Sequence, residues 1–314
     1  MSNYTSNDII NAIAAAAKAL EARKDEINRL NVFPVPDGDT GTNMSLTLAM
    51  VVDNLAKLPI GASSEDRRRA ITTGALMGAR GNSGVITSQI MRGLCEGIAD
   101  HEEFDIVAVD DAFSRAVEVA FNAVRKPVEG TILTVLRDTA TAAHKARKKK
   151  MELDEGLQFI VGESYASVQR TPELLPVLKE NGVVDAGGFG IAIFFDSFVA
   201  SLTGRAEAMV DELAFARTAA PKVEIEQIND WEGSKYKYCN EFLVNSETLD
   251  PEEALDFLQT MGDCELCVGS TPKFKVHVHS NTPDKVLAYF LERGEIFEVF
   301  IHNMKLQSEE RTEK

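Results

Sequence analysis

The stretch Asn31-Val-Phe-Pro-Val-Pro-Asp-Gly-Asp-Thr-Gly-Thr-Asn43 holds two aspartates, Asp37 and Asp39, one glycine apart. Pro34 and Pro36 exclude a helix before the aspartates, because proline lacks an N–H and fixes its φ angle. An apolar run follows at once, so the stretch is predicted to be an extended loop that ends by capping a helix. Two carboxylates at a helix N-terminus form a hard-oxygen site for Mg²⁺, beside amides that can bind phosphate.

The composition limits the class of protein. The chain has 314 residues, 44% of them hydrophobic, which suits about two domains with ordinary cores. The formal net charge of −16 argues against a nucleic-acid partner or an anionic membrane, because affinity for phosphate backbones comes from lysine and arginine.

The N-terminus does not resemble a signal peptide, and no apolar run approaches the roughly 18 residues of a membrane span. Four cysteines do not make a disulfide framework in a chain of this length. We therefore expect a reduced, cytoplasmic protein with no integral membrane segment.

Apolar residues recur every three or four positions through residues 8–204, which predicts eight helices. Short connections favour antiparallel packing, so the second, fourth, sixth and eighth helices would all begin at one end of the bundle. These four follow the loops Asp37-Gly-Asp-Thr-Gly-Thr42, Gly81-Asn-Ser-Gly84, Glu129-Gly-Thr131 and Asp185-Ala-Gly-Gly188. Each loop alone is equally well explained as a turn, but four such helix N-termini at one rim would offer a cluster of backbone amides to an anion.

The helical pattern of residues 1–205 is lost in the segment 206–232, which is predicted to be a linker. Residues 233–306 follow the order β-α-β-β-α-β of a ferredoxin-like domain. The polar tail 307–314 is predicted to be disordered.

Cys239, His277 and His279 form a candidate metal site in the second domain. The two histidines alternate on one strand and so face the same side of the sheet. In a ferredoxin-like sheet the first and third strands are neighbours, which would bring Cys239 beside them. Two imidazoles and a thiolate suit Zn²⁺ with one position left open, and the alternative is a pair of structural histidines on a sheet face.

Three further residues of the second domain are weaker metal candidates. His302 on the last strand is an additional candidate ligand. Cys264 and Cys267 have an odd separation on a strand, which points their sulfurs to opposite faces, so we interpret them as core or edge cysteines.

The aspartate loop also invites comparison with the aspartyl-phosphate phosphatases of the haloacid dehalogenase type. Those enzymes place the nucleophilic aspartate at the end of a buried apolar strand and need Thr or Val two residues after the second aspartate. Phe33-Pro-Val-Pro36 cannot form a central strand, and the required position is Gly41. The sequence therefore disfavours a phosphatase.

Six motifs in order resemble the kinase component of bacterial fatty acid kinase over nearly the whole chain. The kinase domain of that family, which is related to the ATP-binding L domain of dihydroxyacetone kinases, is matched by 31–44, 77–86, 126–135 and 182–188. The middle domain of the same family is matched by Tyr238-Cys-Asn-Glu-Phe242 and Lys275-Val-His-Val-His279. The resemblance implies a multidomain fold, an all-α eight-helix antiparallel barrel with Mg-ATP at one rim followed by the α/β ferredoxin-like domain.

The resemblance also assigns roles to residues. Asp37 and Asp39 would be the catalytic residues and would hold two Mg²⁺ ions. Asn31 stands where dihydroxyacetone kinases have a third aspartate, with one extra residue in the spacing, and would be a Mg²⁺ ligand without charge. The residues that would contact the nucleotide are Thr40, Gly41, Thr42, Asn43, Arg80, Asn82, Ser83, Gly84, Gly130, Thr131, Asp185 and Gly187. For Arg80, a salt bridge at a helix C-terminus is the alternative.

The reaction implied by the resemblance transfers the γ-phosphoryl group of ATP to a fatty acid carboxylate, giving an acyl phosphate. The carboxylate is already an anion, so positioning and metal electrostatics would carry the catalysis. The family presents the fatty acid on a separate DegV-type fatty-acid-binding protein and continues into a further C-terminal domain. Two alternatives stay open: the kinase subunit of a dihydroxyacetone-type small-molecule kinase, and a non-catalytic regulatory module that binds nucleotide and zinc. A homodimer also stays open.

Overall fold

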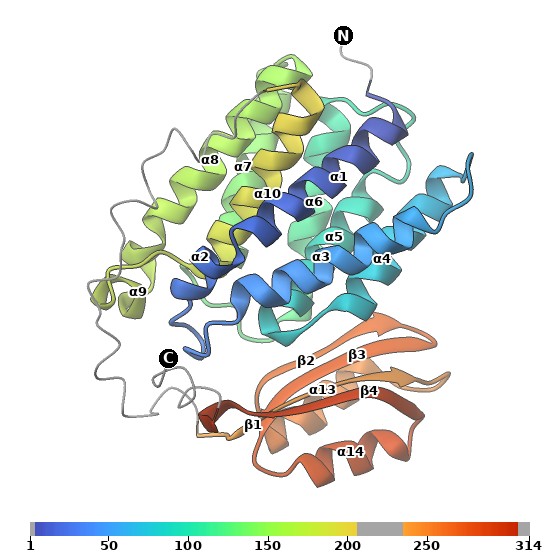
Figure 1. The fold of residues 1–314 in the computed structure, drawn as a ribbon, viewed down its shortest axis with the longest axis vertical. Coiled ribbons are helices and arrows are strands. Elements are labelled where there is room, and N and C mark those ends of the chain that lie inside the picture. Colours follow the sequence, from blue (N-terminus) through green and yellow to red (C-terminus); the bar gives the residue numbers. More distant parts are fainter. Residues whose placement is uncertain (1–3, 206–234, 307–314) are drawn as a thin grey trace.

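The computed structural model describes residues 4–205 and 235–306. The predicted linker 206–232 and tail 307–314 lie outside the described residues. The chain forms a helical domain and a smaller sheet domain that packs against one end of it (Figure 1). The helices of the first domain are α1 (Ser6–Ala22), α2 (Lys24–Arg29), α3 (Thr40–Ala56), α4 (Ser64–Gly78), α5 (Gly81–Gly97), α6 (Ile106–Ala123), α7 (Ile132–Lys148), α8 (Leu153–Leu174), α9 (Pro176–Glu180) and α10 (Ala186–Thr203).

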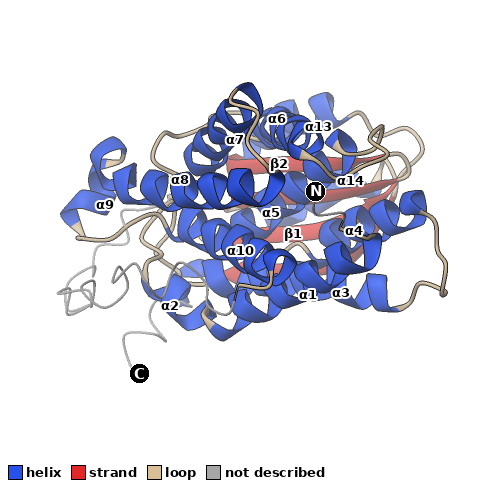
Figure 2. Cartoon of the chain, turned by 90° about the horizontal axis from the view of Figure 1, so that it is seen from above, coloured by secondary structure: helices blue, strands red, loops and turns tan. Residues whose placement is uncertain are grey.

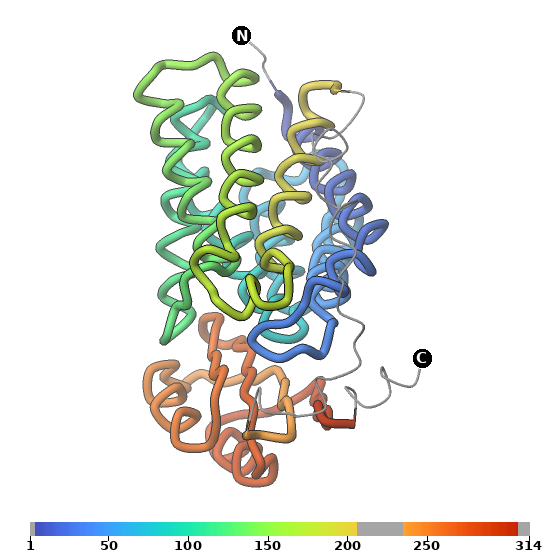
Figure 3. Tube along the Cα trace, turned by 90° about the vertical axis from the view of Figure 1, so that its left-hand side faces the viewer, coloured from blue at the N-terminus to red at the C-terminus, as the bar shows by residue number. Residues whose placement is uncertain are grey.

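The helical domain contains the eight predicted helices in the predicted order. The first is divided into α1 and the short α2 at Arg23, and the seventh, α8, is extended by the short α9. Each long helix packs against the next one along the chain, and α10 returns to pack against α1, so the helices close into a ring of neighbours (Figure 3). The N-termini of α3, α5, α7 and α10 lie at the end of the helical domain that faces the sheet, as helix parity predicts.

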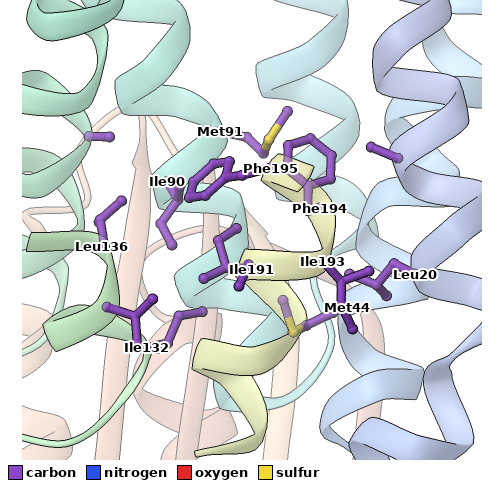
Figure 4. Packing of buried hydrophobic residues seen from close by; sticks show 14 of the residues in the cluster. Leu20, Met44, Ile90, Met91, Ile132, Leu136, Ile191, Ile193, Phe194 and Phe195 are labelled. Atoms are coloured by element: carbon purple, nitrogen blue, oxygen red, sulfur yellow. The ribbon is translucent and has the colours of Figure 1, made fainter. Parts of the chain in front are cut away.

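Helix α10 supplies the centre of the helical core (Figure 4). Ile191, Ile193, Phe194 and Phe195 are all at most 5% exposed and meet apolar side chains from α1, α3, α5 and α7. Among the described helices, α10 alone is long and apolar enough to cross a membrane, but 67% of it is buried within the protein. Burial on all sides explains why this helix is apolar around its whole circumference.

A buried aspartate interrupts the apolar sequence of α10. Asp196 is 0% exposed, and its carboxylate is paired with Arg205 at the end of the same helix. The hydroxyl of Tyr165 donates to the other carboxylate oxygen at 3.1 Å. These partners offset the cost of burying a charge in the core.

The second domain is a four-stranded antiparallel sheet with the strand order β2-β3-β1-β4. The elements follow the predicted order along the chain: β1 (Tyr238–Asn245), α13 (Pro251–Met261), β2 (Gly262–Ser270), β3 (Lys273–Ser280), α14 (Pro283–Leu291) and β4 (Glu295–Asn303). Because β1 pairs with β3, Cys239 lies opposite His279 and Glu241 lies opposite His277.

The two faces of this sheet have different partners. Helices α13 and α14 cover one face, where Phe242, Val276 and Val278 join the apolar core of the domain. The other face lies under the ends of the helices of the first domain (Figure 2). There Leu266 and Val268 of β2 pack against apolar residues at the α4–α5 junction. Both faces are buried, which explains why β1 and β3 are buried almost continuously instead of alternating.

Candidate active site between the helical and sheet domains

A cavity of about 880 Å³ lies between the helix N-termini and the sheet, within the usual size range of small-molecule pockets. Most of the predicted site residues line it together. From the helical domain these are Asn31, Asp37, Asp39, Thr40, Thr42, Asn43, Arg80, Asn82, Ser83, Thr131, Asp185 and Gly187. Cys239, His277 and His279 line it from the sheet domain. The two candidate sites of the sequence are therefore two walls of one cavity.

Three predicted nucleotide contacts lie behind the cavity wall. A Cβ atom at Gly41 would stand 2.3 Å from the carbonyl oxygen of Lys24, so this glycine lets α3 approach α2. A Cβ atom at Gly84 would stand 2.7 Å from the Thr47 hydroxyl, so this glycine lets α5 approach α3. Gly130 has a φ of +82° and donates its N–H to a side chain of α7. In this structure these glycines shape the wall and do not line the cavity.

The aspartate loop is fastened by Asn28, a residue that the sequence did not indicate. Asp39 is the N-cap residue of α3, but its side chain makes no capping hydrogen bond. Instead, the Asn28 side-chain oxygen accepts the N–H groups of Gly41 at 2.8 Å and Thr42 at 3.2 Å. The prediction that the loop caps its own helix is thus wrong in detail, because α2 brings an amide close enough to replace the local cap.

Asn31 braces the same loop from its first residue. Its amide nitrogen donates to the carbonyl oxygen of Val35 at 2.6 Å and lies 3.4 Å from Oδ1 of Asp37. Its amide oxygen accepts the hydroxyl of Thr40. This arrangement turns the Asn31 oxygen toward Thr40, while Asp37 and Asp39 line the cavity.

The ends of α3 and α5 touch at Gly81. This residue has a φ of +58°, and a Cβ atom there would stand 2.1 Å from the Asn43 amide nitrogen. Only glycine combines that backbone conformation with so close a contact. The Gly81-Asn-Ser-Gly84 loop is therefore required to bring two helix N-termini together at the cavity.

Asp185 joins the ends of α7 and α10. Its carboxylate accepts the N–H of Gly188 at 2.7 Å, which caps α10. Burial raises the pKa of Asp185 to about 7, although hydrogen bonds from the backbone of Gly188 and Ile132 partly offset that rise. This carboxylate is thus balanced between its neutral and ionised forms near neutral pH.

Arg80 is bound to the boundary between the domains. Its guanidinium donates to the carbonyl oxygens of Met77 at 3.2 Å and Ala79 at 2.8 Å, at the C-terminus of α4. It also lies 3.4 Å from the Glu298 carboxylate and 4.6 Å above the ring of Phe300. This geometry matches the alternative expected for Arg80, a helix C-terminal salt bridge, at the edge of the cavity.

Cys239, His277 and His279, here called the Cys–His trio, are brought together by the pairing of β1 with β3. All three are buried, and one ligand atom from each lies within 4.8 Å of the others. The sulfur of Cys239 is 3.7 Å from Nδ1 of His277. Burial raises the pKa of the Cys239 thiol, and the charges of Glu241 and Asp39 raise it further. The trio has the donor atoms and spacing for a metal such as Zn²⁺.

Two charged residues beside the trio were given no role by sequence reasoning. Glu241 and Lys275 are at most 3% exposed and lie on the sheet face that meets the helical domain. Burial alone would raise the pKa of Glu241, but interactions with His277, Lys275 and the Gly81 N–H lower it to about 2. Their positions in alternation with Cys239 and His277 are the signal that could have indicated them.

A β-bulge in β2 changes the expected position of one cysteine. The register of β2 against β3 shifts between Asp263 and Leu266, and Cys264 has a φ of +54°. Cys264 therefore lines the cavity beside Asp263 and His279, whereas Cys267 joins the apolar core. Strand alternation could not place Cys264, because the bulge adds a residue between the two cysteines.

The fold and the cavity define a helical domain with an anion-binding rim, two carboxylates at that rim and a metal-binding wall from a second domain. The family model of the DAK2 domain matches residues 34–200, and that of the FakA-like middle domain of fatty acid kinase matches residues 235–311. The chain belongs to the DAK2-domain family and carries this middle domain, which confirms the resemblance inferred from its motifs.

Similar but longer proteins are known from staphylococci. An uncharacterized protein of Staphylococcus haemolyticus is 37% identical over 306 residues, and one of Staphylococcus aureus is 38% identical over 307 residues. Each alignment covers 95% of this chain, which spans 55% of the length of either relative. The dihydroxyacetone kinase from C. freundii, solved in complex with AMP-PNP and Mg²⁺, gives a TM-score of 0.48 at 17% identity, over 63% of this chain and 34% of that one.

Proposed function

We propose that this chain is an ATP-dependent kinase subunit that transfers the γ-phosphoryl group to the carboxylate of a fatty acid. A separate DegV-type fatty-acid-binding protein would present the fatty acid, and the product would be an acyl phosphate. The observation that carries the proposal is the convergence of four helix N-termini, Asp37 and Asp39 on one cavity. The matched family models support a role as the kinase subunit of such an enzyme.

The helical ring, which we interpret as an eight-helix barrel, would bind Mg-ATP at the rim that faces the sheet. Asp37 and Asp39 would hold two Mg²⁺ ions, which supply positive charge to the phosphates. Asn31 would orient Asp37 through its amide nitrogen, and in this structure its own oxygen is engaged by Thr40. The amides of the first turn of α5, at Asn82 and Ser83, would bind phosphate oxygens.

The chemistry suits a carboxylate acceptor, because such an acceptor needs no general base. The residues of this chain would act by holding the phosphates, excluding water and orienting the acceptor. The sheet would close the cavity over the phosphates, so that transfer requires both domains. The use of ATP and four free cysteines are in keeping with a cytoplasmic location.

The Cys–His trio would hold Zn²⁺ in the wall opposite the aspartates. The donor set of one thiol and two imidazoles fits Zn²⁺, and both His277 Nε2 and His279 Nδ1 are buried without a hydrogen-bond partner. A bound ion would satisfy buried polar atoms that the described protein groups leave without hydrogen bonds. Its presence would add positive charge to a cavity rich in carboxylates.

The proposal is tested by mixing the purified chain with labelled ATP, Mg²⁺ and a fatty acid, with and without a fatty-acid-binding partner. Hydroxylamine traps an acyl phosphate as a hydroxamate, which separates this product from ATP hydrolysis. We expect hydroxamate only with the partner present, and none from the Asp37→Ala variant. Turnover of dihydroxyacetone by the chain alone would instead favour the small-molecule kinase, and nucleotide binding without transfer would favour a regulatory module.

A further inference from the structure

Glu241 reaches from the sheet domain to the first residue of α5. Its Oε1 atom accepts the backbone N–H of Gly81 at 2.5 Å. The same oxygen lies 3.4 Å from Nδ1 of His277 and 3.7 Å from the sulfur of Cys239. One carboxylate oxygen is therefore shared between a helix N-terminus at the nucleotide cavity and two members of the Cys–His trio.

These distances match the spacing of ligands around a metal ion. In a tetrahedral Zn²⁺ site with bonds of roughly 2.0–2.3 Å, neighbouring donor atoms lie about 3.3–3.7 Å apart. The triangle of Glu241 Oε1, His277 Nδ1 and Cys239 Sγ has sides of 3.4, 3.7 and 3.7 Å. A direct N–H···O⁻ bond would draw the imidazole and the carboxylate to about 2.7–2.9 Å. The triangle thus fits three ligands of one ion better than a hydrogen-bonded cluster.

His279 is placed to complete this donor set. It lies within the same 4.8 Å group as Cys239 and His277. Its Nδ1 atom is 3.4 Å from Oδ1 of Asp263. A carboxylate beside the second nitrogen of a metal-binding histidine is the usual arrangement that fixes the orientation of its ring.

An ion pair between Glu241 and Lys275 is the competing explanation for the buried carboxylate. The ammonium nitrogen of Lys275 lies 3.7 Å from Oε2 of Glu241, which is beyond hydrogen-bonding distance. Both of these atoms are buried without a hydrogen-bond partner. A purely structural pair in so dry a place is expected to close to a hydrogen bond, because an unmet buried charge is costly. Lys275 therefore does not account for the position of Glu241.

We propose that Glu241 is the fourth protein ligand of a divalent-metal centre formed with the Cys–His trio, and that it couples metal binding to nucleotide binding through Gly81. The coupling rests on the proposed nucleotide site, but not on phosphoryl transfer. Without a metal, the Glu241 carboxylate places a negative charge at the N-terminus of α5, where phosphate would otherwise be favoured. A bound metal ion neutralises that charge. Metal therefore raises the affinity for Mg-nucleotide, and Mg-nucleotide raises the affinity for metal by the same factor.

The first experiment titrates Co²⁺ into the whole chain and follows the visible and near-ultraviolet spectrum, which reports thiolate ligation and coordination geometry. The wild type should bind one ion with the intense bands of a four-coordinate site. Glu241→Gln keeps a carbonyl oxygen for Gly81 but removes the anionic ligand, so it should weaken binding by at least about tenfold and alter the bands. Glu298→Gln removes a carboxylate that pairs with Arg80 across the same domain boundary, and it should leave the spectrum unchanged.

The second experiment measures the affinity for Mg-AMP-PNP with and without Zn²⁺ at the site. Zn²⁺ should tighten nucleotide binding in the wild type and in Glu298→Gln, and should have no effect in Glu241→Gln. Failure of the wild type to bind Co²⁺, or an unchanged spectrum and metal affinity in Glu241→Gln, would overturn the inference. If Glu241→Gln does not fold, Glu241→Asp, whose carboxylate is one methylene shorter, should show the same loss. None of these readouts depends on phosphoryl transfer, so a metal-binding chain without kinase activity would refute only the proposed function.

Discussion

The side-chain oxygen of Asn28 accepts the backbone N–H of Gly41 at 2.8 Å, and so caps α3 from a neighbouring helix. A residue at the N-cap position commonly turns its own side chain back to the first turn. Here Asn28 meets that need, and the N-cap residue Asp39 makes no capping bond. The carboxylate at the rim is therefore available to the cavity because another element caps the helix.

Replacement of Asn28 tests this division of roles. Asn28→Ala leaves two N–H groups of α3 without their acceptor, so we expect a loss of about 0.5–2 kcal/mol in the free energy of unfolding. We also expect weaker Mg-nucleotide binding, because Asp39 becomes the nearest replacement cap. Denaturant unfolding and calorimetry measure the two effects. A variant with normal stability and normal nucleotide affinity would show that the Asn28 cap is unimportant.

Gly81 and Gly182 form a matched pair for testing the contact between α3 and α5. Both have positive φ angles, +58° and +64°, but only Gly81 faces a side chain at the position of a Cβ atom. Each substitution by alanine should cost about 1–2 kcal/mol for the backbone conformation. Gly81→Ala should cost more, because its methyl group collides with Asn43. Equal losses in thermal or denaturant unfolding would contradict the close contact.

The raised pKa of Asp185 predicts a pH-dependent stability. The folded-state pKa of about 7 lies above the ordinary value of 3.8, so the folded protein holds a proton that the unfolded chain releases between about pH 4 and pH 7. The contribution is full below about pH 4 and is lost as the pH rises to about 7, by up to about 1.4 kcal/mol per pH unit. Asp185→Asn keeps an oxygen for Gly188 and should remove this slope. Parallel pH profiles of unfolding for variant and wild type would contradict the assignment.

The repeating features of the sequence predict the fold well. The apolar period gives the eight helices, and helix parity brings four glycine-bearing loops to one end. Strand alternation and the β-α-β-β-α-β order place Cys239 beside His277 and His279. These predictions succeed because each depends on regular geometry within one element or between consecutive elements.

The features that the sequence does not predict all depend on contacts between distant segments or on a local irregularity. Asn28 caps α3 because α2 lies against that helix, and nothing in its own segment indicates the role. Glu241 gains its environment from Gly81, which lies 160 residues away. Cys264 turns toward the cavity because of a bulge in β2. The shared cavity follows from domain packing, which periodicity within one domain cannot show.

The central claim, that Asp37 and Asp39 form the magnesium site for a nucleotide, is tested most directly by calorimetry of AMP-PNP binding with and without Mg²⁺. The wild type and Asp25→Ala, which removes an exposed carboxylate of α2 outside the cavity lining, should bind with Mg²⁺ and lose affinity without it. Asp37→Ala and Asp39→Ala should weaken the Mg²⁺-dependent binding by at least about tenfold. Nucleotide binding that is equal in all four proteins, or that does not depend on Mg²⁺, would contradict the claim.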